Sequence, residues 1–131
     1  MKKLKDKSTE ETIITCGIEM KEETDLASKI CIPCQGGVPP LTRYEMEKLI
    51  TKLNTKWEII DDHHLQRVWK FNDFKEALEF TNLAGEICEE QNHHADFELG
   101  WGRVKVKIFT HKIDGLVESD FILAAKFDLL D

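Results

Sequence analysis

The pattern of hydrophobic and polar positions predicts a helix followed by a β-hairpin in the first half of the folded region. Thr42 and Glu45 match a capping box, in which each side chain binds the other residue's backbone amide. The apolar residues that follow at helical spacing are Met46, Leu49, Ile50 and Leu53. Residues 57–60 and 65–71 then alternate as two strands, and Arg67 is the polar exception on the apolar face of the second strand.

A second helix and a second hairpin follow, and a third helix closes the pattern. Asn72 or Asp73 can cap the second helix, which has a broad apolar face and ends near Asn92. Residues 97–101 and 104–108 alternate as strands, and the glycines between them permit a turn or a bulge. The apolar residues of the last helix are Phe121, Ile122, Ala125 and Leu129.

Two hairpins separated by a helix cannot form a simple parallel βαβ sheet. The order helix-strand-strand-helix-strand-strand-helix predicts an α+β fold, a four-stranded antiparallel sheet with helices packed on one face. A chain of 131 residues with 41% hydrophobic and 33% charged residues fits one globular domain. Residues 1–30 show little periodicity and predict a mobile extension, which leaves residues 31–131 as the domain.

The net charge of -7 argues against direct binding to nucleic acid, since it lacks the positive field that attracts phosphates. Lys105 and Lys107 alternate with apolar residues and fit the solvent face of one strand. No apolar run is long enough to cross a bilayer, and the basic residues 1–7 precede no apolar signal segment. We therefore expect a cytoplasmic protein without a membrane partner.

The cysteines leave metal or redox chemistry open. Cys31 and Cys34 form a C-x-x-C pair, which in a cytoplasmic chain is more typical of a metal or redox pair than of a structural disulfide. No second C-x-x-C follows to complete a zinc site of four thiolates. We favour two reduced thiols in a loop, with Cys88 as a small buried residue of the second helix.

A spaced set of polar residues in the last third of the chain is the strongest candidate for chemistry. It comprises Glu89, His93, His94, Trp101, His111 and Asp120. His93 and His94 fall where the second helix meets a strand, and His111 follows the partner strand. Antiparallel pairing that sets Asp96 near Thr110 would bring the three imidazoles to one end of the sheet. Because histidine titrates near neutrality, this arrangement indicates a site for proton transfer or metal binding.

The spacing of this set resembles the signature of the pterin-4a-carbinolamine dehydratases. Flanking sequences agree with that family as well: Phe71-x-x-Phe74, Asn92–Asp96, Thr110-His111 and Gly115-Leu116. The lead-in Cys31–Pro40 is similar to that of many bacterial and plant-type members, so the resemblance covers Cys31 to the C-terminus. Two positions depart from the pattern: Ala95 replaces a Pro, Cys or Ser, and Val117 replaces a Ser or Thr. Since Val117 cannot cap, we expect a helix start weaker by about 1 kcal/mol and a freer Asp120.

The resemblance implies a dehydration. A 4a-hydroxytetrahydropterin, formed when aromatic amino-acid hydroxylases use their cofactor, loses water to give quinonoid dihydropterin. The hydroxyl must gain a proton and a ring nitrogen must lose one, which calls for an acid and a base but no metal or other cofactor. The implied catalytic residues are His93, His94 and His111. Of these, His93 and His111 would transfer protons and His94 would bind and orient the pterin.

The resemblance implies further contacts to the pterin. The implied substrate-binding residues are Glu89, Ala95, Trp101, Thr110, Lys112 and Asp120. Packing in a core or an interface fits Trp101 as well as stacking on substrate does. Favourable electrostatics at helix ends is an alternative explanation for Glu89 and Asp120. The family also implies a homodimer or homotetramer, with a possible protein partner.

Two other classes of function remain as alternatives. The first is a dimerisation, assembly or transcriptional cofactor of the same fold, either without activity or with a second role. The second is a metal or redox protein that uses Cys31, Cys34 and the histidines. A second histidine pair, His63 and His64, lies in the first hairpin turn without the family spacing, and we interpret it as solvated.

Overall fold

The computed structural model of the protein describes residues 25–32 and 39–131. The elements are η1 (Leu26–Ser28), α1 (Arg43–Ile50), β1 (Glu58–Ile60), β2 (His64–Lys70), α2 (Phe74–Gln91), β3 (Asp96–Gly100), β4 (Arg103–Ile108) and α3 (Glu118–Asp128). From α1 onward this is the predicted order of helices and strands. The four strands form one antiparallel sheet in the order β1-β2-β4-β3, which confirms the α+β fold class.

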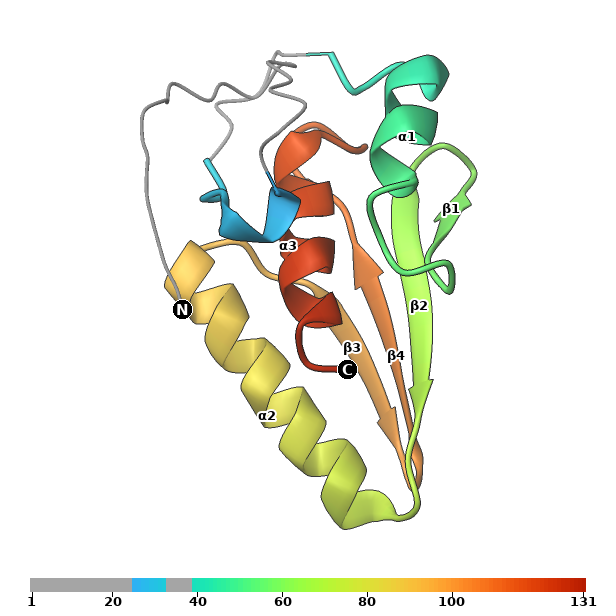
Figure 1. Cartoon of the computed structure of the whole chain (residues 1–131), viewed down its shortest axis with the longest axis vertical. Helices are drawn as coiled ribbons and strands as arrows, with labels where there is room; N and C mark the ends of the chain where they lie inside the picture. The colour runs from blue at the N-terminus through green and yellow to red at the C-terminus, as the bar shows by residue number, and fades with distance from the viewer. Residues whose placement is uncertain (1–24, 33–38) are drawn as a thin grey trace.

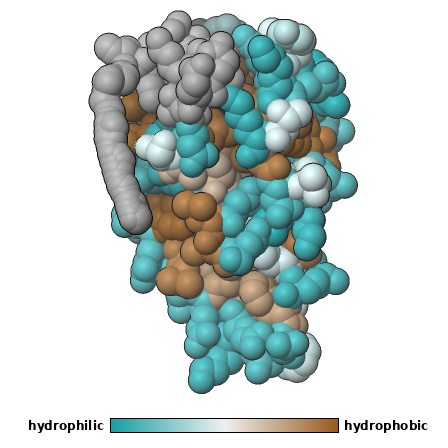
Figure 2. All heavy atoms as spheres, viewed as in Figure 1, coloured by the Kyte–Doolittle hydropathy of each residue, from teal (hydrophilic) through white to brown (hydrophobic). Residues whose placement is uncertain are grey.

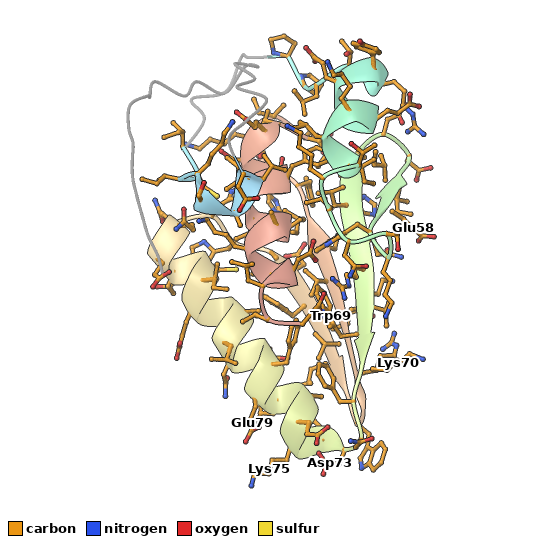
Figure 3. The ribbon with its side chains drawn as sticks, in the orientation of Figure 1. Glu58, Trp69, Lys70, Asp73, Lys75 and Glu79 are labelled. Atoms are coloured by element: carbon orange, nitrogen blue, oxygen red, sulfur yellow. The ribbon has the colours of Figure 1, made fainter. Side chains whose placement is uncertain are left out.

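The helices pack against one face of the sheet, with α2 running along it and α3 lying between α2 and the strands in the view of Figure 1. Alternate residues of β4 supply the centre of the core, and Val104, Val106 and Ile108 have no exposed surface. Trp69 of β2 extends into the helical layer (Figure 3) and its ring lies 4.6 Å from that of Phe80 on α2. The two-residue period of the strands therefore separates the core from the solvent face, as predicted.

Local signals at the helix ends act as the sequence indicates. The Thr42 hydroxyl accepts from the Glu45 amide, and the Glu45 carboxylate accepts from the Thr42 amide, so the predicted capping box is confirmed. Asp73, labelled at the start of α2 in Figure 3, accepts from the Glu76 amide at 2.9 Å. Asn92 ends α2 in the left-handed conformation with φ 51°. That conformation turns the chain sharply out of the helix and toward β3.

The register of the second hairpin differs from the expected one by three residues. Asp96 lies opposite Lys107 instead of Thr110, because the turn contains only Trp101 and Gly102. A Cβ at Gly102 would lie 2.8 Å from the backbone oxygen of Phe71, so glycine permits this tight approach. The same register, continued past the ends of the strands, sets residue 93 opposite residue 110.

Arg67, the polar exception on β2, is buried and bound to the end of the last helix. Its guanidinium donates to Asp128 at 2.5 Å and to Asp131 at 2.9 Å. The indole N–H groups of Trp57 and Trp69 donate to the same two carboxylates, each at 2.8 or 2.9 Å. Charged hydrogen bonds therefore compensate the burial of Arg67 and join β2 to the C-terminal turn.

Residues 25–32 lie against α3. Leu26 of η1 is buried, and Lys29 makes a buried ion pair of 2.7 Å with Glu118. Residues 25–30 belong to the segment expected to form the extension, and residues 1–24 lie outside the described part of the chain.

No helix among the described residues is long and apolar enough to cross a membrane. Figure 2, in the same orientation as Figure 1, shows hydrophobic residues interspersed with hydrophilic ones on the face toward the viewer.

Candidate active site

The centre of the candidate site is the carboxylate of Asp120, which lies in the first turn of α3 and has no exposed surface. Its Oδ1 lies 2.7 Å from Nε2 of His93. The Thr110 hydroxyl donates to both carboxylate oxygens, at 3.1 and 2.9 Å, and the Val117 amide donates to Oδ2 at 2.8 Å. Asp120 thereby joins the loop after α2, the end of β4 and the start of α3.

The expectation that Val117 leaves Asp120 freer is wrong. Val117 offers no side-chain cap, but its side chain is fully buried and its amide donates to Asp120. One of the two hydrogen bonds of a capping box is therefore present, from the Val117 amide to Asp120. Thr110 and His93 also bind the Asp120 carboxylate. A Ser or Thr at position 117 would bind the backbone of α3 through its hydroxyl. Val117 instead contributes a buried apolar side chain.

The loop after α2 sets the direction of His93. The His93 amide donates to the Cys88 carbonyl at 3.1 Å, an i→i−5 bond that closes the end of the helix after the left-handed Asn92. The Ala95 amide then contacts the Cys88 thiol sulfur at 3.5 Å. The backbone amides of His93 and Ala95 are thus both bound to Cys88 of α2. His93 itself is mostly buried, with 17% of its side chain exposed.

His94 points to a different environment from its neighbour. Its Nε2 lies 2.5 Å from Oε2 of Glu89 in the last turn of α2, and both side chains are largely exposed. Adjacent residues of an extended chain point to opposite sides, which explains this separation. Glu89 therefore contacts the imidazole of His94.

His111 lies on an exposed turn that is closed by the paired backbones of Thr110 and Gly115. The ring of His111 stacks on that of Phe109, with centroids 4.2 Å apart and planes 27° apart. Lys112, the next residue, is exposed. Thr110 connects this turn to the centre of the site, because its hydroxyl donates to Asp120 while its own neighbour in the chain is His111.

The interpretation of His63 and His64 as solvated is wrong. Both are half-buried, and their Nδ1 atoms lie 3.1 Å apart. Nε2 of His63 lies 2.8 Å from Oδ1 of Asp114, and the His63 ring lies 4.4 Å from the Phe109 ring. The first hairpin turn therefore contacts the His111 turn. The register of β2 on β4, which no local pattern in the sequence predicts, sets residue 64 beside residue 109.

Trp101 is not brought together with the histidines. It lies in the turn between β3 and β4, at the end of the hairpin opposite to the one that leads to Thr110, and 71% of it is exposed. The Phe71 amide donates to the Gly102 carbonyl, so this tip lies beside the start of α2. The aromatic residue of β3 that points toward the helices is Phe97, whose ring lies 6.1 Å from that of Phe127.

The described cysteines are buried thiols. Burial raises the pKa of Cys31 to about 12, and burial also raises the pKa of Cys88. Cys34 and Cys16 lie outside the described residues, so the geometry of the C-x-x-C pair does too. Among residues 25–32 and 39–131, no group of three His, Cys, Asp or Glu side chains is arranged to hold a metal ion.

The fold and the site define an α+β protein in which a buried carboxylate holds one histidine and a second histidine lies on the adjoining turn. A family model described as pterin 4 alpha carbinolamine dehydratase matches residues 39–130. A protein of Rubrobacter xylanophilus is 56% identical over 82% of this chain and 99% of its own length. A protein of Alkaliphilus metalliredigens is 54% identical over 79% of this chain and 94% of its own length. Both carry the provisional name of a pterin-4-alpha-carbinolamine dehydratase.

A solved structure supports the same assignment. The crystal structure of a transcriptional coactivator/pterin dehydratase from Brucella melitensis is 30% identical to this chain, with a TM-score of 0.65. It covers 70% of this chain, and this chain covers 97% of it. The chain belongs to the pterin-4-alpha-carbinolamine dehydratase family.

Proposed function

We propose that the protein is a hydro-lyase that converts a 4a-hydroxytetrahydropterin into a quinonoid dihydropterin and water, by histidine acid-base catalysis, in the recycling of tetrahydrobiopterin. The bond between the ring carbon and the hydroxyl breaks while a ring nitrogen loses its proton. A catalytic acid gives one proton to the departing hydroxyl, and a base takes one from the nitrogen, so one water is released. The step is an elimination without net oxidation or reduction, which needs no redox cofactor.

The hydrogen bond between His93 and Asp120 is the observation that carries this proposal. The Asp120 carboxylate receives the Thr110 hydroxyl and the Val117 amide, so it acts as an acceptor. We therefore assign the proton of the 2.7 Å hydrogen bond to Nε2 of His93. In that tautomer Nδ1 of His93 carries the lone pair, and we assign His93 as the base.

His111 supplies the complementary acid in this proposal. It lies next to Thr110, whose hydroxyl is bound to Asp120, so the two histidines flank one hydrogen-bonded unit. The exposed turn that carries His111 leaves its ring open to substrate and to proton exchange with water. An acid and a base on separate elements can act on the hydroxyl and the ring nitrogen in the same step.

The remaining polar groups at this end of the sheet are proposed to bind the pterin. His94, whose Nε2 lies 2.5 Å from Oε2 of Glu89, carries an exposed imidazole at the same end of the sheet. Ala95, Thr110 and Lys112 lie on the two loops that carry the histidines. Trp101 lies at the other end of the hairpin, and we leave it out of the substrate site.

Stopped-flow absorbance, with a 4a-hydroxytetrahydropterin generated in the mixing step, tests this function. The native protein should accelerate loss of the substrate, and His93→Gln or His111→Gln should each lower kcat by about a hundredfold or more, as expected for loss of an acid or base. His94→Gln should mainly raise KM. A native protein that leaves the spontaneous rate unchanged would rule the function out.

A role in binding a protein partner is the second candidate function. The Brucella melitensis relative is described as a transcriptional coactivator as well as a pterin dehydratase. In this chain Trp101 and Phe74 are exposed at the same end of the molecule, 71% and 43%, away from the histidines. If this surface binds a partner, Trp101→Ala should weaken co-purification of that partner and leave the dehydration rate unchanged.

A further inference from the structure

The second histidine pair forms a contact network with the turn that carries His111. The ring of Phe109 contacts two imidazoles, with its centroid 4.4 Å from that of His63 and 4.2 Å from that of His111. Lys107, on the same face of β4, lies 5.8 Å from the Phe109 centroid. Phe109 is therefore the ring through which His63 and His111 are in contact.

A second connection joins His63 to the same turn. Nε2 of His63 lies 2.8 Å from Oδ1 of Asp114, and the Asp114 amide donates to the His111 carbonyl at 3.1 Å. Asp114 has φ 55°, so the turn is held in a left-handed conformation that aspartate tolerates better than most residues. Two connections therefore link His63 to the turn that carries His111: one arm of the network runs through Phe109 and the other through Asp114.

His63 is itself held from the other side. Its Nδ1 lies 3.1 Å from Nδ1 of His64, so one ring donates and the other accepts. The His64 ring also lies 6.4 Å from the Phe109 ring. A histidine that is fixed at both ring nitrogens and packed against an aromatic face loses most of its freedom to rotate. This rigidity is unnecessary for a solvated turn residue, but it suits a residue that fixes the orientation of another ring.

We propose that His63 is a positioning residue for His111 and acts on it through Phe109 and Asp114. This inference rests on the proposed function, in which His111 is the acid. An exposed imidazole on a turn samples several rotamers, and only those aimed at the leaving hydroxyl are productive. Stacking on Phe109 selects one ring plane, and the bond from His63 to Asp114 holds the turn at a fixed distance from β2.

Two substitutions separate the arms of the network. His63→Phe keeps an aromatic ring against Phe109 and removes the bond to Asp114. His63→Gln keeps a side-chain amide that can bond to Asp114 and removes the ring. Each should lower kcat less than His63→Ala does, for which we expect a loss of about tenfold to a hundredfold with little change in KM. Asp62→Asn, on the same turn but paired with Arg43, is the matched control and should leave kcat unchanged.

The double variant tests whether His63 acts through His111. If it does, His63→Ala should cost nothing further in a His111→Ala background, whereas a general effect on the fold would lower the residual rate again. Thermal unfolding of each variant gives the folded fraction. An additional loss in the double variant, or an unchanged kcat in His63→Ala, would overturn the proposal.

An NMR measurement decides the positioning independently of activity. Stacking at 4.2 Å should displace the Hε1 resonance of His111 upfield through the ring current of Phe109. His63→Ala should move it toward its position in Phe109→Leu, while the Hε1 resonance of His94 stays in place. An unmoved His111 resonance would overturn the positioning role. Absence of dehydration by the native protein would instead overturn the proposed function, and the resonance would still decide the role of His63.

Discussion

Nε2 of His93 lies 2.7 Å from Oδ1 of Asp120, a carboxylate without exposed surface. Twenty-seven positions separate these residues in the chain, and the two meet because the loop after α2 and the first turn of α3 converge on the end of β4. The other donors to Asp120 come from Thr110 and Val117, so the histidine is held by a carboxylate whose own position is fixed. Preorganisation of this kind is what an acid-base site requires.

Asp120→Asn should lower kcat by at least about a hundredfold, because an amide that donates to Nε2 would favour the wrong tautomer of His93. The substitution keeps the size of the side chain, and the dehydration rate measures its effect. Asp128→Asn is the matched control, since Asp128 lies on the same helix but binds Arg67. The control should lose stability and keep its kcat. An equal loss of kcat in both variants would contradict the role given to Asp120.

Arg67→Ala should destabilise the fold by roughly 3–5 kcal/mol, because it leaves the Asp128 carboxylate without its buried partner. Urea unfolding followed by tryptophan fluorescence measures this, and Trp57 and Trp69 report directly since both bind the same carboxylates. Arg43→Ala, which removes exposed ion pairs to Glu47 and Asp62, should cost less than about 1 kcal/mol. Similar losses in the free energy of unfolding for the two variants would show that burial of Arg67 does not increase its contribution to stability.

Acidification should destabilise the protein partly through His64. Burial, together with the nearby charge of Lys107, lowers the pKa of His64 below its ordinary value of 6.5. The unfolded chain therefore binds more protons than the folded one as the pH falls below that value, so this contribution to stability is present near neutrality and lost in acid. The free energy of unfolding between pH 7.5 and 5 should fall less steeply in His64→Gln. An identical pH dependence in both proteins would exclude this contribution.

Cys31 and Cys88 should resist alkylation in the folded protein. A pKa of about 12 leaves a thiolate fraction of about 10⁻⁴ for Cys31 at pH 8, and burial blocks access as well. Iodoacetamide labelling with peptide mass spectrometry should show slow modification of both residues in buffer and rapid modification in denaturant. Rapid labelling of Cys31 in the folded protein would indicate a reactive thiol and would support the redox alternative.

The sequence predicts those parts of the fold that depend on neighbouring residues. Thr42 and Asp73 start their helices with contacts three residues away, and the alternation of β4 follows from its own side chains. The histidines His93 and His111 are likewise placed by the hairpin that lies between them. Each of these predictions needs only short-range geometry.

One error is local: the three-residue shift in the register of the second hairpin arises because Trp101 belongs to the turn and not to the strand. The other errors concern contacts between distant elements. Pairing of β2 with β4 joins strands separated by the whole of α2, and nothing local sets residue 64 beside Phe109. For the same reason His63 could not be related to Asp114 from the sequence. The missing cap at Val117 is a local signal that predicts a freer Asp120, whereas the donors from Thr110 and His93 arrive from elsewhere.

The rate of dehydration in the His93→Ala, His111→Ala double variant, measured by stopped-flow absorbance at saturating protein, tests the central claim most directly. Removal of both the acid and the base should bring the rate close to that of the spontaneous reaction, while far-UV circular dichroism shows an unchanged fold. Trp101→Ala, at the opposite end of the hairpin, should keep kcat/KM within about twofold, as expected for a surface residue outside the site. A double variant that dehydrates the pterin at the native rate would contradict the account.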